Sequence, residues 1–115
     1  MRLLLISNST NPGEEYLDYP KLNIKSFLGE KEVNAIFIPY AAVTFSFEEY
    51  EDKVNKRFAE IGHKVTSIHR FSNPVEAVEN ADAIVVGGGN TWQLVKMLHD
   101  NNLIKPIRKK VKEGT

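Results

Sequence analysis

The chain has 115 residues and a mass of 13.0 kDa, which is the size of a single domain with one core. Fifteen Lys and Arg side chains balance fifteen Asp and Glu side chains, so we expect neither nucleic acid nor an acidic membrane surface as a partner. The absence of cysteine excludes disulfides, thiolate nucleophiles and cysteine-ligated zinc. The apolar runs are too short to span a bilayer, and without a signal-peptide pattern we expect a cytoplasmic protein.

Four short apolar runs predict the strands of a parallel sheet. In chain order they are Arg2–Ser7, Ala35–Ile38, Lys64–His69 and Ala83–Val86. Near-continuous apolar strands are typical of a parallel sheet that is covered on both faces. The third run is the least apolar of the four, which favours a position at the edge of the sheet.

Segments of helical character separate these runs. The clearest is Phe47–Ile61, where apolar side chains recur on one face and Ser46 with Glu49 predicts a capping box at the start. The other predicted helices are Tyr16–Leu28, in which Pro20 predicts a kink or a late start, a short segment after Pro74, Thr91–His99 and Ile104–Lys112.

This alternation predicts an α/β fold with a doubly wound, mainly parallel sheet and helices on both faces, of the flavodoxin-like type. Four strands are few for such a sheet, which usually has about five or six. The last predicted helix ends at Gly114, where the alternation would call for a further strand. We therefore expect the fold to be incomplete within this chain.

Three loops follow the carboxyl ends of predicted strands, where open parallel sheets bind ligands: Ser7–Gly13, Pro39–Ser46 and Gly87–Thr91. The last has three successive glycines before a helix, so it can present backbone amides at the positive end of a helix dipole. Such a loop suits a phosphate, a carboxylate or the oxyanion of a tetrahedral intermediate. It matches neither the P-loop nor the dinucleotide fingerprint, and a simple tight turn is the alternative interpretation.

Few side chains are candidates for catalysis. No serine lies in a G-x-S-x-G elbow, and no pair of histidines has metal-ligand spacing, so we expect no metal site. His69, at the end of the third predicted strand, and Tyr40, just past the second, are placed to reach a ligand. By themselves the residues indicate an oxyanion cradle without a nucleophile.

Motifs in a fixed order give this chain a family resemblance. They are Leu3–Thr10 (LLLISNST), Phe37–Ala41 (FIPYA), Ile68–Arg70 (IHR) and Val85–Thr91 (VVGGGNT). Together they resemble the peptidase E family of bacterial aspartyl dipeptidases, whose fold is related to the class I glutamine-amidotransferase domain. The resemblance covers essentially the whole chain.

The resemblance implies a serine peptidase that removes an N-terminal aspartate from Asp-X dipeptides and needs no cofactor. It implies oxyanion-hole amides at Gly88, Gly89 or Asn90. It also implies a basic group for the substrate carboxylate, for which Arg70 and Lys21 are the candidates. The family's nucleophile lies in a G-W-S-A-G elbow on the next strand, followed by a histidine and an acid, and this sequence has none of them.

We therefore expect residues 1–115 to form the N-terminal part of a single peptidase E-like domain, inactive by itself and completed by a C-terminal complementary polypeptide. Two alternatives remain open. One is a stand-alone flavodoxin-like module that binds a small anion at Gly87–Thr91. The other is an inactive fragment.

Overall fold

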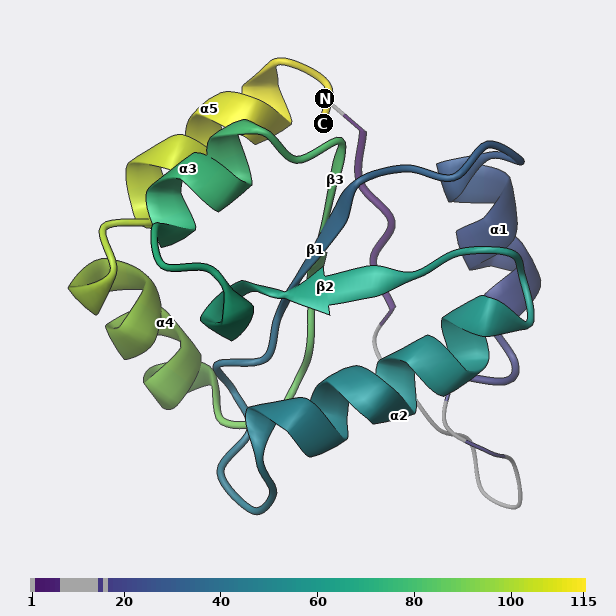
Figure 1. The fold of residues 1–115 in the computed structure, drawn as a ribbon, viewed down its shortest axis with the longest axis horizontal. Helices are drawn as coiled ribbons and strands as arrows, with labels where there is room; N and C mark the ends of the chain where they lie inside the picture. Colours follow the sequence, from purple (N-terminus) through teal and green to yellow (C-terminus); the bar gives the residue numbers. More distant parts are fainter. Residues whose placement is uncertain (1, 7–14, 16) are drawn as a thin grey trace.

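The computed structural model describes residues 2–6, 15 and 17–115 and has a three-stranded parallel sheet between two groups of helices (Figure 1). The strands are β1 (Ala35–Ile38), β2 (Val65–Ser67) and β3 (Ala83–Val86), in the order β2-β1-β3. The predicted α/β class is confirmed. The edge position predicted for the third apolar run is confirmed as well, because among the described strands β2 pairs with β1 alone.

The helices cover both faces of the sheet. They are α1 (Lys21–Leu28), α2 (Phe47–Ala59), α3 (Pro74–Glu79), α4 (Thr91–Asp100) and α5 (Ile104–Lys112), with a 3-10 turn η1 (Ile68–Arg70). Side chains of β1 alternate between two clusters: Phe37 packs with α1 and α2, whereas Ile36 and Ile38 pack on the side of α3, α4 and α5. Figure 1 shows these two groups of helices on opposite sides of the sheet.

Local capping signals set the helix starts. The Ser46 side chain accepts a hydrogen bond from the Glu49 amide at 3.1 Å, and Asn73 caps α3 ahead of Pro74 in the same way. Asn90 accepts from the Gln93 amide at 3.0 Å and so caps α4. The predicted late start of the first helix is also confirmed, because α1 begins at Lys21, directly after Pro20.

The third predicted strand is shorter than expected. It ends at Ser67, which lies opposite Phe37, and the chain then turns into η1. The Phe71 amide closes this turn on the Ile68 carbonyl at 3.1 Å. His69 therefore lies in a helical turn rather than in a strand.

The strand predicted at Arg2–Ser7 is wrong as far as the structure describes it. Residues 2–6 belong to no strand, and in the described part of the chain no backbone hydrogen bond joins them to the sheet. The Ser7–Gly13 loop lies outside the described residues. An apolar run becomes a strand only when its main chain pairs with a neighbouring strand, and residues 2–6 pair with none of the described strands. Arg2 is held instead by α1, where its guanidinium donates to the Phe27 carbonyl at 2.7 Å.

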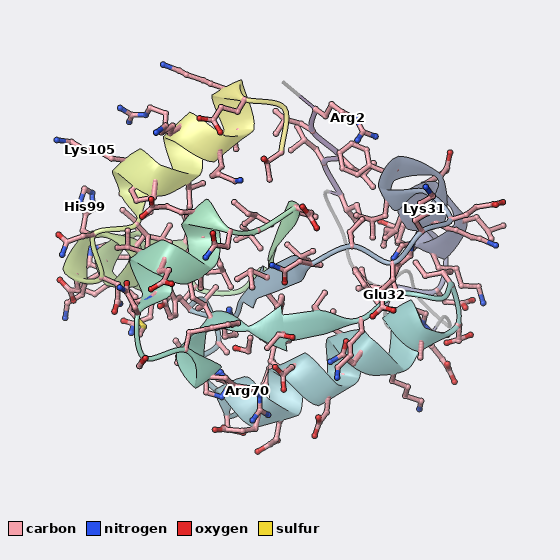
Figure 2. All side chains as sticks on the ribbon, turned by 45° about the horizontal axis from the view of Figure 1, so that its top comes forward. Arg2, Lys31, Glu32, Arg70, His99 and Lys105 are labelled. Carbon is pink, nitrogen blue, oxygen red and sulfur yellow. The ribbon has the colours of Figure 1, made fainter. Side chains whose placement is uncertain are left out.

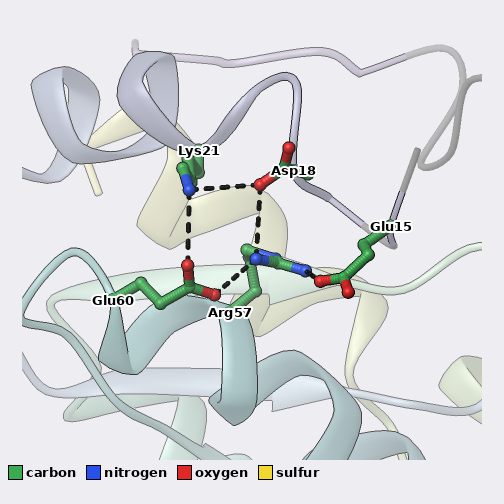
Figure 3. A network of polar contacts seen from close by, with 5 residues as sticks. All are labelled: Glu15, Asp18, Lys21, Arg57 and Glu60. Atoms are coloured by element: carbon green, nitrogen blue, oxygen red, sulfur yellow. Dashed lines mark hydrogen bonds and ion pairs between the residues drawn. The ribbon is translucent and has the colours of Figure 1, made fainter.

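An ion-pair network joins the segment before α1 to α2 (Figure 3). At its centre is Arg57, which is 6% exposed and contacts Glu15, Asp18 and Glu60. Lys21 contacts Asp18 at 3.1 Å and Glu60 at 3.3 Å. A buried guanidinium requires such partners, so the network fixes α1 against α2.

Candidate functional site

The glycine loop is tied to the sheet at both ends. The Gly87 amide donates to the Ile38 carbonyl at 3.1 Å, and the Asn90 amide donates to the Ala41 carbonyl at 2.9 Å. Between them, the amides of Gly88 and Gly89 donate to no group in the described part of the chain. The loop therefore presents two open amide donors beside the start of α4.

Close packing explains two of the three glycines. A Cβ on Gly87 would lie 2.5 Å from the Tyr50 hydroxyl, and a Cβ on Gly89 would lie 2.5 Å from the Ala41 carbonyl oxygen. Gly89 also has φ +141°, which disfavours any side chain. A Cβ on Gly88 would meet nothing within 4 Å. A tight turn thus accounts for Gly87 and Gly89, whereas Gly88 faces open space.

Tyr50 of α2 orients the middle of the loop. Its hydroxyl donates to the Gly88 carbonyl at 3.0 Å, and its ring lies edge-on to Phe37 and Phe45. In a trans peptide the N–H points away from the preceding C=O, so the Gly89 amide points away from Tyr50. The sequence signal for Tyr50 was its place in the apolar stripe of α2, which predicts burial and says nothing of this contact.

A cavity of about 840 Å³ opens beside the loop. Residues 2–6, β3 and the glycines 87–89 line it, together with side chains of α1 and α2. Three charged residues are among the lining: Arg2, Lys53 and Asp82. Arg2 donates to a backbone carbonyl of α1, Asp82 accepts from the Asn34 amide, and the Lys53 ammonium lies over the Phe45 ring, so all three have structural partners.

The two side chains predicted to reach a ligand lie away from this cavity. Tyr40 is 4% exposed in the core beside Phe47, and burial raises the pKa of its phenol. His69 lies near Ser67, with the hydroxyl 2.5 Å from Nδ1, and its Nε2 lies 3.2 Å from Glu48. The sequence analysis missed this group of hydroxyl, imidazole and carboxylate. Because Ser67 is fully buried, its hydroxyl cannot reach a substrate.

The two cationic candidates for binding a substrate carboxylate both have partners. Arg70 lies beside α2 (Figure 2), and its Nε contacts the two carboxylate oxygens of Glu51 at 2.8 and 3.0 Å. Burial of Glu51 favours its neutral form, but hydrogen bonds from Arg70 and the Ser67 amide prevail and lower the pKa of its carboxyl. Lys21 belongs to the network of Figure 3.

Metal binding and membrane insertion find no support in the described residues. Within the described ranges, no three or more His, Asp or Glu side chains come together as metal ligands. None of the helices in that part of the chain combines the length and the apolar character that a membrane span requires.

The remaining histidine on a helix, His99 of α4, points outward into solvent (Figure 2).

Comparisons with known proteins agree with the fold. The family model described as "Peptidase family S51" matches residues 3–115. A protein named "Peptidase E" from Nostoc sp. is 50% identical over 114 residues, which cover 99% of this chain and 47% of the relative. The "Peptidase E" proteins of Salmonella newport and Salmonella typhi are 44% and 43% identical over 114 residues, covering 99% of this chain and 49% of each relative. The chain thus spans about half the length of the curated relatives it matches, and it belongs to peptidase family S51.

Proposed function

We propose that this chain supplies the scaffold and the oxyanion-binding loop of a serine-type peptidase that hydrolyses Asp-X dipeptides in the cytoplasm. Residues 1–115 would form the N-terminal part of one domain, and a C-terminal polypeptide would carry the serine, the histidine and the acid. Family membership and the relatives named peptidase E support peptidase activity. The preference for aspartate comes from the motif resemblance.

The observation that carries this proposal is the pair of open amides at Gly88 and Gly89. When a serine oxygen adds to the substrate carbonyl carbon, the carbonyl oxygen becomes an oxyanion, and it returns to a carbonyl as the amine leaves. Two fixed N–H donors stabilise that charge without reorganisation. The Asn90 amide already donates to Ala41, which favours Gly88 and Gly89 over Asn90 as the donors.

Lys53 is the residue that we assign to the carboxylate of the substrate's aspartate. It lines the same cavity as the glycine loop, and its ammonium lies 5.9 Å from the centre of the Phe45 ring. Lys53→Met in an active assembly should raise KM for Asp-Leu about tenfold and change kcat little. Lys56→Met, on the exposed side of the same helix, is the matched control.

The function is testable in a chimera of residues 1–115 and the part of the Nostoc peptidase E outside the matched 114 residues. We expect release of aspartate from Asp-Leu. Gly88→Pro removes one amide donor and should lower kcat by about 10². Gly88→Ala keeps the N–H and has room for its Cβ, so its kcat should stay within a few-fold of the parent.

Two results would overturn the proposal. One is a folded chimera that releases no aspartate from Asp-Leu. The other is a folded Gly88→Pro variant whose kcat equals that of Gly88→Ala, because the loop would then serve only as a turn. Circular dichroism of each variant shows whether it is folded.

The second candidate function is a small-anion-binding module, which the same two amides at the start of α4 favour. It predicts that the chain by itself binds inorganic phosphate, with NMR shifts that saturate at the Gly88 and Gly89 amides. If these two amide signals do not shift at about 20 mM phosphate, the anion-binding function is excluded.

A further inference from the structure

We infer that Tyr50 is a positioning residue for the oxyanion-binding loop, because its phenol holds the peptide between Gly88 and Gly89 with the Gly89 N–H open to a ligand. A positioning residue acts through another group, and here that group is this N–H. The inference rests on the proposed function, since it names the side chain that gives one of the two donors its direction.

The loop is held by different groups at its ends and in its middle. Main-chain hydrogen bonds fix both ends, through the amides of Gly87 and Asn90. In the middle, the described part of the chain offers the Gly88 carbonyl one hydrogen-bond donor, the Tyr50 hydroxyl at 3.0 Å. The orientation of the middle peptide therefore depends on a side chain.

The middle peptide needs such a contact because a glycine lies on each side of it. Its orientation is set by ψ of Gly88 and φ of Gly89, and neither residue has a Cβ to restrict these angles. A Cβ on Gly88 would meet nothing within 4 Å, so this residue also has open space beside it. Rotation of the peptide plane would turn the Gly88 carbonyl to the side that the Gly89 N–H now faces. A carbonyl there would repel an oxyanion instead of binding it.

The phenol is itself held in one place. Tyr50 is 5% exposed, and its ring lies edge-on to two other aromatic rings, with centroids 4.9 Å from Phe37 and 5.0 Å from Phe45. The approach of the hydroxyl to the loop also needs a glycine at position 87, where a Cβ would lie 2.5 Å from the hydroxyl oxygen. The first glycine of the loop and the aromatic packing of α2 thus serve the same contact.

The test is Tyr50→Phe in the chimera of residues 1–115 and the part of the Nostoc peptidase E outside the matched residues. The variant keeps the packed ring and removes the hydroxyl, so kcat for Asp-Leu should fall at least about tenfold while KM changes less than about twofold. Tyr40→Phe also removes a tyrosine hydroxyl, in the core beside Phe47, and is the matched control. Val78→Ala lowers stability from the core on the other face of the sheet. Both controls should leave kcat within about twofold of the parent.

A second readout follows the peptide itself and does not require activity. Glycine labelled with 13C at the carbonyl and with 15N gives coupled signals only at successive glycines, which in this chain are residues 87–89. In the chain alone, Tyr50→Phe should move the Gly88 carbonyl signal upfield, because that carbonyl loses its hydrogen bond, and should shift or broaden the Gly89 amide signal. Tyr40→Phe should leave both signals unchanged.

The outcomes separate this inference from the proposed function. An active chimera whose kcat is unchanged by Tyr50→Phe overturns the positioning role, and so does an equal fall of kcat in Tyr40→Phe or Val78→Ala. A parent chimera that does not cleave Asp-Leu overturns the proposed function. In that case an unchanged Gly88 signal overturns the positioning role as well, whereas a shifted signal supports Tyr50 as the group that orients this peptide. If Tyr50→Phe does not fold, Gly87→Ala breaks the same contact by displacing the ring, and the same fall of kcat is expected.

Discussion

The two edges of the sheet are finished differently. At the β2 edge, α2 supplies side chains in place of a strand: Asn55 accepts from the Val65 amide at 2.7 Å and donates to the Val65 carbonyl at 2.9 Å. Glu51 accepts from the Ser67 amide at 2.5 Å. At the β3 edge, the described residues provide no equivalent partner for Ile84 or Val86. Side chains of α2 satisfy the main-chain groups at the β2 edge, whereas those at the β3 edge have no such partner in the described part of the chain.

This difference shows that composition does not decide how deeply a strand is buried. β1 has the sequence AIFI and β3 has AIVV, and the two strands pair in register along their length. β1 has a strand on each side and β2 has α2 at its outer edge, whereas the described part of the chain gives β3 neither on its outer side. The contrast between centre and edge can therefore be tested by substitutions at paired positions.

The largest effect should come from the centre of the sheet. Phe37 of β1 and Val85 of β3 are register partners. Phe37→Ala should lower the free energy of unfolding by about 4 kcal/mol, because the ring is fully buried and its loss leaves a cavity. Val85→Ala should cost about 1 to 2 kcal/mol, because its side chain is only half-buried. Urea unfolding of both variants measures the difference, and equal losses would contradict the contrast.

The closed edge should be the next most sensitive. Asn55→Ala leaves the N–H and C=O of buried Val65 without partners, at a cost of about 2 to 4 kcal/mol. It should also speed exchange of the Val65 amide toward the rate of the outward amides on β3. Lys56→Ala, one position along α2 and exposed, should change stability by less than about 0.5 kcal/mol. A loss no greater than this control would mean that the edge does not need the asparagine.

At the end of β3, alanine substitutions at two neighbouring glycines should differ in how much stability they cost. Gly89→Ala forces a Cβ against the Ala41 carbonyl at a φ unsuited to alanine, and we expect a loss of about 2 kcal/mol. Gly88→Ala should cost less than about 1 kcal/mol, since its Cβ meets nothing. Thermal or urea unfolding distinguishes them, and a stable Gly89→Ala variant would mean that the loop is looser than the structure shows.

The smallest predicted effect is a pH dependence at the closed edge. The pKa of Glu51 is lowered in the folded state, so its carboxylate stabilises the fold above pH 4.5 and this contribution fades as the pH falls through the folded pKa. Glu51→Gln should reduce the loss of unfolding free energy that follows acidification below pH 4.5. If the free energy of unfolding falls equally with pH in the parent and the variant, Glu51 is not the source of the pH dependence. Glu48→Gln controls for the exposed neighbour, whose pKa is lowered chiefly by its own backbone amide.

Local signals predicted much of the fold. The caps at Ser46 and Asn90, the late start at Lys21 and the strands β1 and β3 depend on residues close in sequence, so the sequence sufficed. The run at residues 2–6 has the same apolar character, yet strand formation depends on a neighbour that the local sequence does not specify. Pattern alone cannot distinguish a paired strand from an unpaired one.

In the candidate site too, local features could be predicted from the sequence, whereas contacts between distant residues could not. Three glycines before an asparagine predicted a loop with amides at a helix start, and the roles of Gly88, Gly89 and Asn90 in catalysis stay predictions. The contact of Tyr50 with Gly88 joins residues 38 positions apart, and the pairing of Arg70 with Glu51 joins residues 19 apart. Neither spacing follows from a periodic pattern, so only the three-dimensional structure reveals them.

The Tyr50 phenol also changes the electronic character of the loop. By donating to the Gly88 carbonyl, it polarises the shared peptide group and draws electron density from its nitrogen. The Gly89 N–H becomes a stronger donor as a result. An aromatic residue on α2 thus strengthens an N–H donor on the far side of a peptide plane.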